Sequence, residues 1–117
     1  MESDNVIQIK SYAFAVKIVN LYKHPSEEKK EYILSKQLLR SATSVGVNIE
    51  EAIGGQSRKD FYAKLTISYK EARETKYWLR LLTDTDYLTE EKSKPLLEDA
   101  EELLRIIGSI QKTIRNS

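Results

Sequence analysis

Few residues of this sequence have the types and spacing of a catalytic or metal site. There is no cysteine, which excludes a thiol nucleophile and a thiolate metal site. His24 is the only histidine and sits beside Pro25 at a helix end, so we expect no histidine able to act as the base of a serine. Gly54-Gly55 lacks the Gly-Lys-Ser pattern of a phosphate-binding loop. Glu71 and Glu74 have a spacing that could hold a hard cation, but pairing with Arg or Lys of a neighbouring helix is the expected role. We therefore expect no enzyme, no metal and no cofactor.

Polar and small side chains recur at helical spacing in two stretches, which indicates contact between them. In the first stretch, residues 37–51, the polar side chains lie about 100° around the predicted helix from the apolar stripe of that helix. In the second stretch Ser68, Ala72 and Thr75 are small, so two helix backbones can approach closely. The predicted polar stripe consists of Gln37, Arg40, Ser41, Ser44, Asn48, Glu51, Ser68, Glu71 and Glu74. Within it we hypothesise a buried network of Arg40, Asn48, Glu51, Glu71 and Glu74; an ordinary solvated flank is the alternative.

An apolar strip on the stretch around residues 58–83 falls outside its core stripe. The strip consists of Ile67, Trp78 and Leu81. An apolar patch that includes a tryptophan is typical of contact with another protein chain. We therefore predict a homo-oligomer with Trp78 in or near the interface, the alternative being that Trp78 covers the end of a long helix.

The other flank of the same stretch interleaves cations with tyrosines. Its members are Arg58, Tyr62, Tyr69, Arg73, Lys76 and Arg80, which fall within about 80° of one another on a helical wheel. Cations can pair with phosphates and tyrosine rings can stack on bases. The flank is a candidate nucleic-acid contact, and a solvated helix face is the alternative.

Four long helices are required to position these residues. Apolar spacings of three and four predict helices roughly over 4–23, 27–53, 58–83 and 90–115. Short connections make consecutive helices antiparallel, so we expect one all-α domain over residues 1–117, an up-down-up-down four-helix bundle.

The ends of the predicted helices follow from capping side chains and from proline and glycine, which interrupt helices. Pro25 ends the first helix at His24, and Ser26, followed by two glutamates, can cap the second. Gly54-Gly55 supplies left-handed or flexible backbone, and Ser57 begins the third helix as in a capping box. Residues 84–86 read as a turn. For the last helix, either Thr89 is the cap and Pro95 kinks the first turns, or Ser93 is the cap.

Composition limits the class of protein. The chain has 117 residues, is 40% hydrophobic and 32% charged, and carries a net charge of +1, which argues against disorder, a membrane span and a uniformly basic nucleic-acid binder. The beginning of the sequence lacks the pattern of a signal peptide. We expect a cytoplasmic protein without a membrane partner.

Two segments together resemble a known family. QLLRSATSVGVNIEEA (residues 37–52) and DFYAKLTISYKEARETKYWLRLL (residues 60–82) are similar to the bacterial four-helix-bundle family, also called the 23S ribosomal RNA intervening-sequence proteins. The family's characteristic residues match Gln37, Arg40, Ser41, Ser44, Asn48, Glu51, Ser68 and Glu74.

The resemblance implies an antiparallel bundle that assembles as a homopentamer, in a family whose biochemical role is unassigned. A related branch, the accessory variability determinants of diversity-generating retroelements, is strongly basic and binds nucleic acid and a reverse transcriptase, whereas this chain is nearly neutral. Two functions stay open: a non-enzymatic assembly or adaptor module with a protein partner, and an accessory protein that binds structured RNA or single-stranded DNA.

Overall fold

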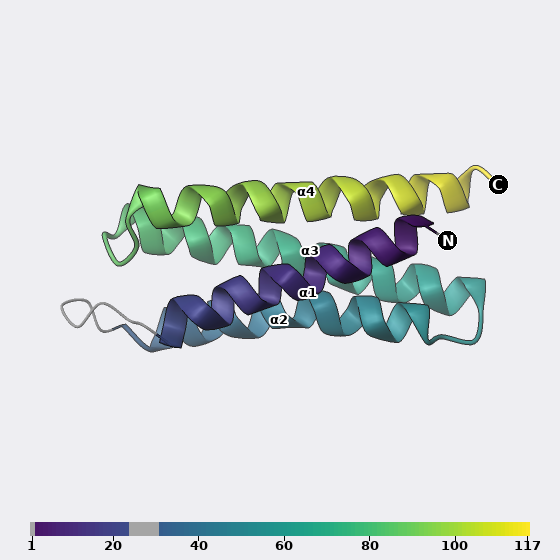
Figure 1. Cartoon of the computed structure of the whole chain (residues 1–117). Helices are drawn as coiled ribbons and strands as arrows, with labels where there is room; N and C mark the ends of the chain where they lie inside the picture. The colour runs from purple at the N-terminus through teal and green to yellow at the C-terminus, as the bar shows by residue number, and fades with distance from the viewer. Residues whose placement is uncertain (1, 24–30) are drawn as a thin grey trace.

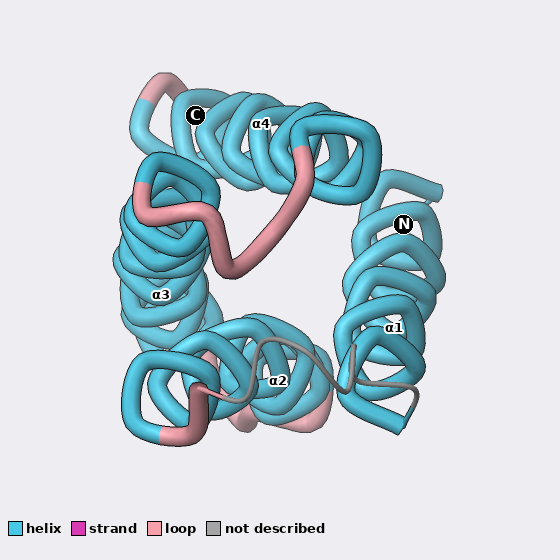
Figure 2. The backbone as a smooth tube through the Cα atoms, turned by 90° about the vertical axis from the view of Figure 1, so that its left-hand side faces the viewer, coloured by secondary structure: helices cyan, strands magenta, loops and turns pink. Residues whose placement is uncertain are grey.

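Four helices make up almost all of the computed structural model, which describes residues 2–23 and 31–117. They are α1 (Glu2–Lys23), α2 (Ile33–Ile53), α3 (Arg58–Asp84) and α4 (Glu90–Arg115). Consecutive helices run in opposite directions along a body of 51 × 21 × 21 Å (Figure 1). Viewed from the end, they occupy the corners of a square in chain order (Figure 2). The predicted up-down-up-down, all-α bundle is confirmed.

The core lies along the axis of the bundle and is built from the apolar stripes that the sequence predicts. Each helix contributes side chains that are at most 2% exposed, such as Phe14, Leu38, Leu79 and Ile107. Of the four pairs of helices that are in contact, α2 and α3 pack most extensively. Burial of these side chains stabilises the fold by about 1.5–3 kcal/mol each relative to exposure.

The first turn of α2 begins later than the sequence predicts. Ser26 and the two following glutamates lie outside the described residues, and Glu31 and Tyr32 are not helical, so a start at residue 27 is wrong. Instead, the Glu31 carboxylate accepts hydrogen bonds from the backbone N–H groups of Ile33, Leu34 and Ser35 at 3.0, 2.9 and 2.9 Å. Glu31 therefore satisfies donors that a helix start leaves without partners.

The substitution Glu31→Gln is expected to destabilise the fold by about 1 kcal/mol at neutral pH, the usual value of a helix cap. Desolvation alone would raise the pKa of Glu31, but the three backbone N–H groups and the Ser35 hydroxyl outweigh it and lower that pKa. The stabilisation is therefore present above the carboxyl's unfolded pKa and is lost as the pH falls through the lower folded pKa. Urea unfolding of both proteins should show a difference that shrinks below about pH 4; a difference independent of pH would contradict this role.

The other helix ends are set by small side chains. Ser57 Oγ accepts from the backbone N–H of Asp60 at 3.0 Å, and Thr89 Oγ1 accepts from that of Lys92 at 3.3 Å. Thr89 is thus the cap of α4, and the helix continues through Pro95.

Of the two glycines in the α2–α3 turn, Gly55 lies close to neighbouring atoms. No glycine in the described residues has positive φ, so of the two alternatives for Gly54-Gly55, left-handed or flexible backbone, the left-handed one is wrong. A Cβ atom on Gly55 would lie 2.4 Å from Asp60 Oδ2. The left-handed residue of the described chain is Asp86, with φ of 67°, in the predicted turn after α3.

Candidate functional site

Small and hydroxyl-bearing side chains line the contact between α2 and α3, which we call the α2–α3 seam (Ser41, Val45, Ser68, Ala72 and Thr75). All five are fully buried. Ser68 Oγ donates to the backbone carbonyl of Val45 at 2.9 Å, and the hydroxyl oxygens of Ser41 and Thr75 lie 2.9 Å apart. Each of these hydroxyls has a partner, so the seam carries polar atoms into the core without leaving them unsatisfied.

Beside the seam, the Arg40 guanidinium joins the two carboxylates of α3. Nη1 donates to Glu71 at 3.0 Å, Nη2 donates to Glu74, and Nε donates to Gln37 Oε1 at 3.1 Å. Trp78 Nε1 donates to the same Glu74 carboxylate at 2.9 Å. The side chain of Arg40 is 49% exposed and that of Glu71 is 18% exposed, so the cluster lies at the surface edge of the seam and not inside it. Ion pairs with this degree of exposure contribute at most about 1 kcal/mol to the free energy of folding.

The hypothesised network of five side chains is not formed, because two of its members bond elsewhere. The Asn48 amide donates to the carbonyl and hydroxyl oxygens of Ser44, one turn earlier in its own helix, at 2.9 and 3.1 Å. Glu51 accepts from Lys64 Nζ at 2.8 Å. Glu51 lies about 16 Å along α2 from Arg40, and at that level the antiparallel α3 presents Lys64, not Glu71 or Glu74.

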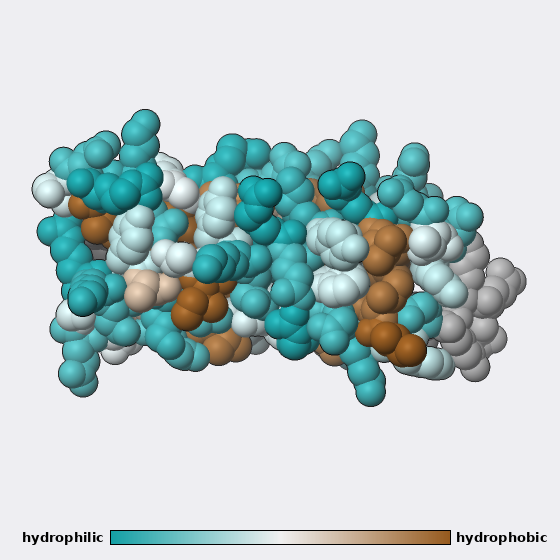
Figure 3. Space-filling view, turned by 180° about the vertical axis from the view of Figure 1, so that it is seen from behind, coloured by the Kyte–Doolittle hydropathy of each residue, from teal (hydrophilic) through white to brown (hydrophobic). Residues whose placement is uncertain are grey.

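The predicted apolar strip on α3 is only partly exposed. Trp78 packs against the core, with its ring edge-on to Tyr77 at a centroid distance of 5.0 Å, and Leu81 is also partly buried. Ile67 is 43% exposed. Figure 3 views the side on which α3 lies, and its apolar residues form separate patches among polar ones. That Trp78 lies in an oligomer interface stays a prediction. The exposed apolar residues around it do not form one continuous surface.

A larger apolar surface, which the sequence reasoning missed, lies on α1. The α1 outer stripe (Ile9, Tyr12, Val16 and Val19) falls on the side of the helix opposite Phe14 and Ile18, and its members are 41–69% exposed. The spacing of three, four and three residues was itself the signal, because it is that of a coiled-coil seam.

The cationic flank of α3 divides into two parts. Lys76 Nζ pairs with Glu101 at 3.0 Å, and Arg80, further along, is level with the acidic first half of α4. Near the other end, Arg58 donates to Ser117 Oγ at 2.6 Å, and the Tyr62 hydroxyl accepts from Arg115 at 2.7 Å. Tyr69 is partly buried against the core, and Arg73 is exposed.

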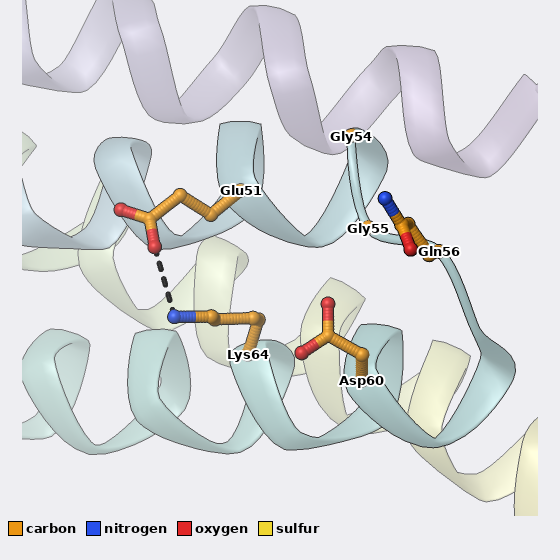
Figure 4. A pocket seen from close by; sticks show the side chains of 6 residues that line it. All are labelled: Glu51, Gly54, Gly55, Gln56, Asp60 and Lys64. Atoms are coloured by element: carbon orange, nitrogen blue, oxygen red, sulfur yellow. Dashed lines mark hydrogen bonds and ion pairs between the residues drawn. The ribbon is translucent and has the colours of Figure 1, made fainter.

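An open depression of about 520 Å³ lies at the α2–α3 turn (Figure 4). Glu51, Asp60 and Lys64 supply its charged groups. The hydrogen bond from Lys64 to Glu51, with the charge of that carboxylate, raises the pKa of Lys64. The amine is therefore held in its protonated form, which is neither a base nor a nucleophile.

The described residues contain neither a cluster of metal ligands nor a helix that could span a membrane. Residues 2–23 and 31–117 contain no group of three or more histidine, cysteine, aspartate or glutamate side chains placed to hold a metal ion. Within the same ranges, none of the helices has the length and hydropathy needed to cross a membrane.

Comparison with known proteins finds one matching family model and a similar solved structure. The family model described as 23S rRNA-intervening sequence protein matches residues 3–109. The chain is also similar to a crystal structure of a protein of unknown function from the S23 ribosomal protein family of Bacteroides thetaiotaomicron, at 52% identity and a TM-score of 0.89, covering 94% of this chain and 98% of that one. No curated protein matches significantly. This chain belongs to the 23S rRNA-intervening sequence protein family.

Proposed function

We propose that this protein is a non-enzymatic assembly module that associates with copies of itself through the α1 outer stripe. The observation that carries the proposal is the exposure of the stripe: Ile9 and Tyr12 are 68% and 69% exposed, although the opposite face of the same helix is buried in the core. A helix that is apolar on two faces has one face more than a lone bundle can cover.

Residues that flank the stripe favour a second copy of this chain as its occupant. Beside a coiled-coil seam, charged residues usually determine which helices can pair. Here the flanking positions include Ala13, Ala15 and Asn20, so identical helices meet without like-charge repulsion. Lys10 and Lys17, on the side of the helix that meets α4, are engaged within the chain by Glu102 at 3.3 Å and Asp99 at 2.7 Å. Lys23, in the last turn of α1, is the cation at the end of the stripe.

Light scattering coupled to gel filtration tests the proposal directly. We expect a mass several times the 13.5 kDa of one chain, with five copies as the number that the family resemblance implies. The mass should fall on dilution only at concentrations near the dissociation constant. A particle of 13.5 kDa at every concentration would contradict self-association.

A further inference from the structure

The edge between α3 and α4 carries cations from both helices, whereas the helical wheel of α3 alone predicts only those of α3. We call it the α3–α4 basic edge (Arg58, Arg73, Arg105, Lys112 and Arg115). All five side chains are exposed. We propose that this edge binds the phosphate backbone of a single nucleic-acid strand.

Contacts between α3 and α4 bring these cations into one row. Arg115 reaches Tyr62, Gln111 Nε2 donates to Thr66 Oγ1 at 2.7 Å, and a Cβ on Gly108 would lie 3.8 Å from the Tyr69 ring. This antiparallel register places Arg73 of α3 level with Arg105 of α4. From Arg58 to Arg73 the row extends about 22 Å, at 1.5 Å per residue.

The row has an excess of positive charge because few acids lie along it: Glu101, which pairs with Lys76 at 3.0 Å and also attracts the charge of Arg105, lies at one end. The second half of α4, residues 103–115, contains no Asp or Glu, whereas residues 90–102 contain six. On α3, Glu71 and Glu74 turn towards α2 and are occupied by Arg40. None of the five cations forms an ion pair with a residue in the part of the chain that the structure describes. The net charge of +1 therefore conceals a local cationic row.

The mode of binding differs from the sequence-based expectation of base stacking. Tyr69 packs against the core and Tyr62 is partly buried with its hydroxyl held by Arg115. Both rings lie partly buried between the cations of α3 and those of α4 and offer little free face to a base. Recognition is thus electrostatic and independent of sequence, as for other contacts made to phosphates alone.

Fluorescence anisotropy with a labelled oligouridine of about 20 nucleotides tests the proposal, since such a strand is longer than most single-strand binding sites. Five neutralised phosphates give a log–log salt slope of about −3.5 for a single strand between about 50 and 200 mM salt. The triple variant Arg73→Gln/Arg105→Gln/Lys112→Gln should bind more than tenfold more weakly, with a slope of about −1.4 from the two remaining cations.

A matched control removes the same net charge elsewhere. Lys36, Lys92 and Lys94 are exposed and lie off the edge, on α2 and the first turns of α4. Lys36→Gln/Lys92→Gln/Lys94→Gln should keep the wild-type slope and bind within about twofold of wild type, since non-contacting charges are largely screened. Arg73→Lys/Arg105→Lys, which retains the charges, should keep the slope as well.

Either of two results would overturn the proposal: no binding by the wild-type chain at low salt, or equal losses in the two triple variants. Circular dichroism establishes that each variant is folded. Self-association through α1 is measured separately by mass, so its failure would leave the test of the α3–α4 basic edge intact.

Discussion

Ile9→Asp/Val16→Asp is expected to convert the proposed assembly into a folded monomer. Both side chains belong to the α1 outer stripe and are 68% and 41% exposed in the single chain, so the isolated bundle has no need of them. Their exposed fractions together equal about one fully exposed side chain, so burying both in an interface contributes about 1.5–3 kcal/mol, which corresponds to a dissociation constant raised about 10- to 10²-fold. The two carboxylates would also have to lose water against a neighbouring apolar helix.

Light scattering measures the mass of this variant, and circular dichroism measures its helicity. The control Ile33→Asp/Val47→Asp makes the same chemical change at positions that are 78% and 53% exposed on α2, away from the stripe. The control should keep the wild-type mass. If the α1 variant also keeps that mass, the stripe is not the interface; if the α1 variant is monomeric but unfolded, the stripe stabilises the bundle itself.

Ala72→Leu is expected to destabilise the bundle by about 3 kcal/mol or more. Ala72 is fully buried in the α2–α3 seam, between Ser68 and Thr75, whose hydroxyls reach across to α2. Extra methylenes in a packed core cost about 1–3 kcal/mol. Moving α3 away from α2 would also break the bond from Ser68 to Val45 and leave a buried hydroxyl without a partner, at about 1–3 kcal/mol.

Chemical denaturation at neutral pH checks this value, with Ala63→Leu as the matched control. Ala63 lies on the exposed face of the same helix, so the identical substitution there should change the free energy of unfolding by less than about 0.5 kcal/mol. Equal and small effects at both positions would mean that the seam has room for a larger side chain and that its small residues are not required for helix approach.

The fold could be predicted because its determinants are local. Spacings of three and four residues place the core stripes of α2, α3 and α4, and Ser57 and Thr89 mark two helix starts within a few positions of the residues that they cap. The start of α2 could not be predicted in the same way. Its cap is the long Glu31 side chain, which folds back to reach three N–H groups and does not fit the usual pattern of a serine or aspartate cap.

The candidate sites could be predicted only in part, since a helical wheel gives an angle and not a level on the neighbouring helix. Small residues in α3 indicated close contact with α2, and Arg40 does reach Glu71 and Glu74. Glu51 was assigned to the same group because it shares the angle, although it lies level with Lys64. Arg105 and Arg115 were missed for the corresponding reason: they join the cations of α3 only once α4 is packed beside them.

The chain-order arrangement of the helices also has a kinetic consequence. Because α2 lies next to α3 and α3 next to α4, most contacts between helices join segments separated by one short turn. Closing such short loops costs little conformational entropy, so helical bundles of this topology fold within microseconds to milliseconds. The proposed self-association would therefore join bundles that have already folded.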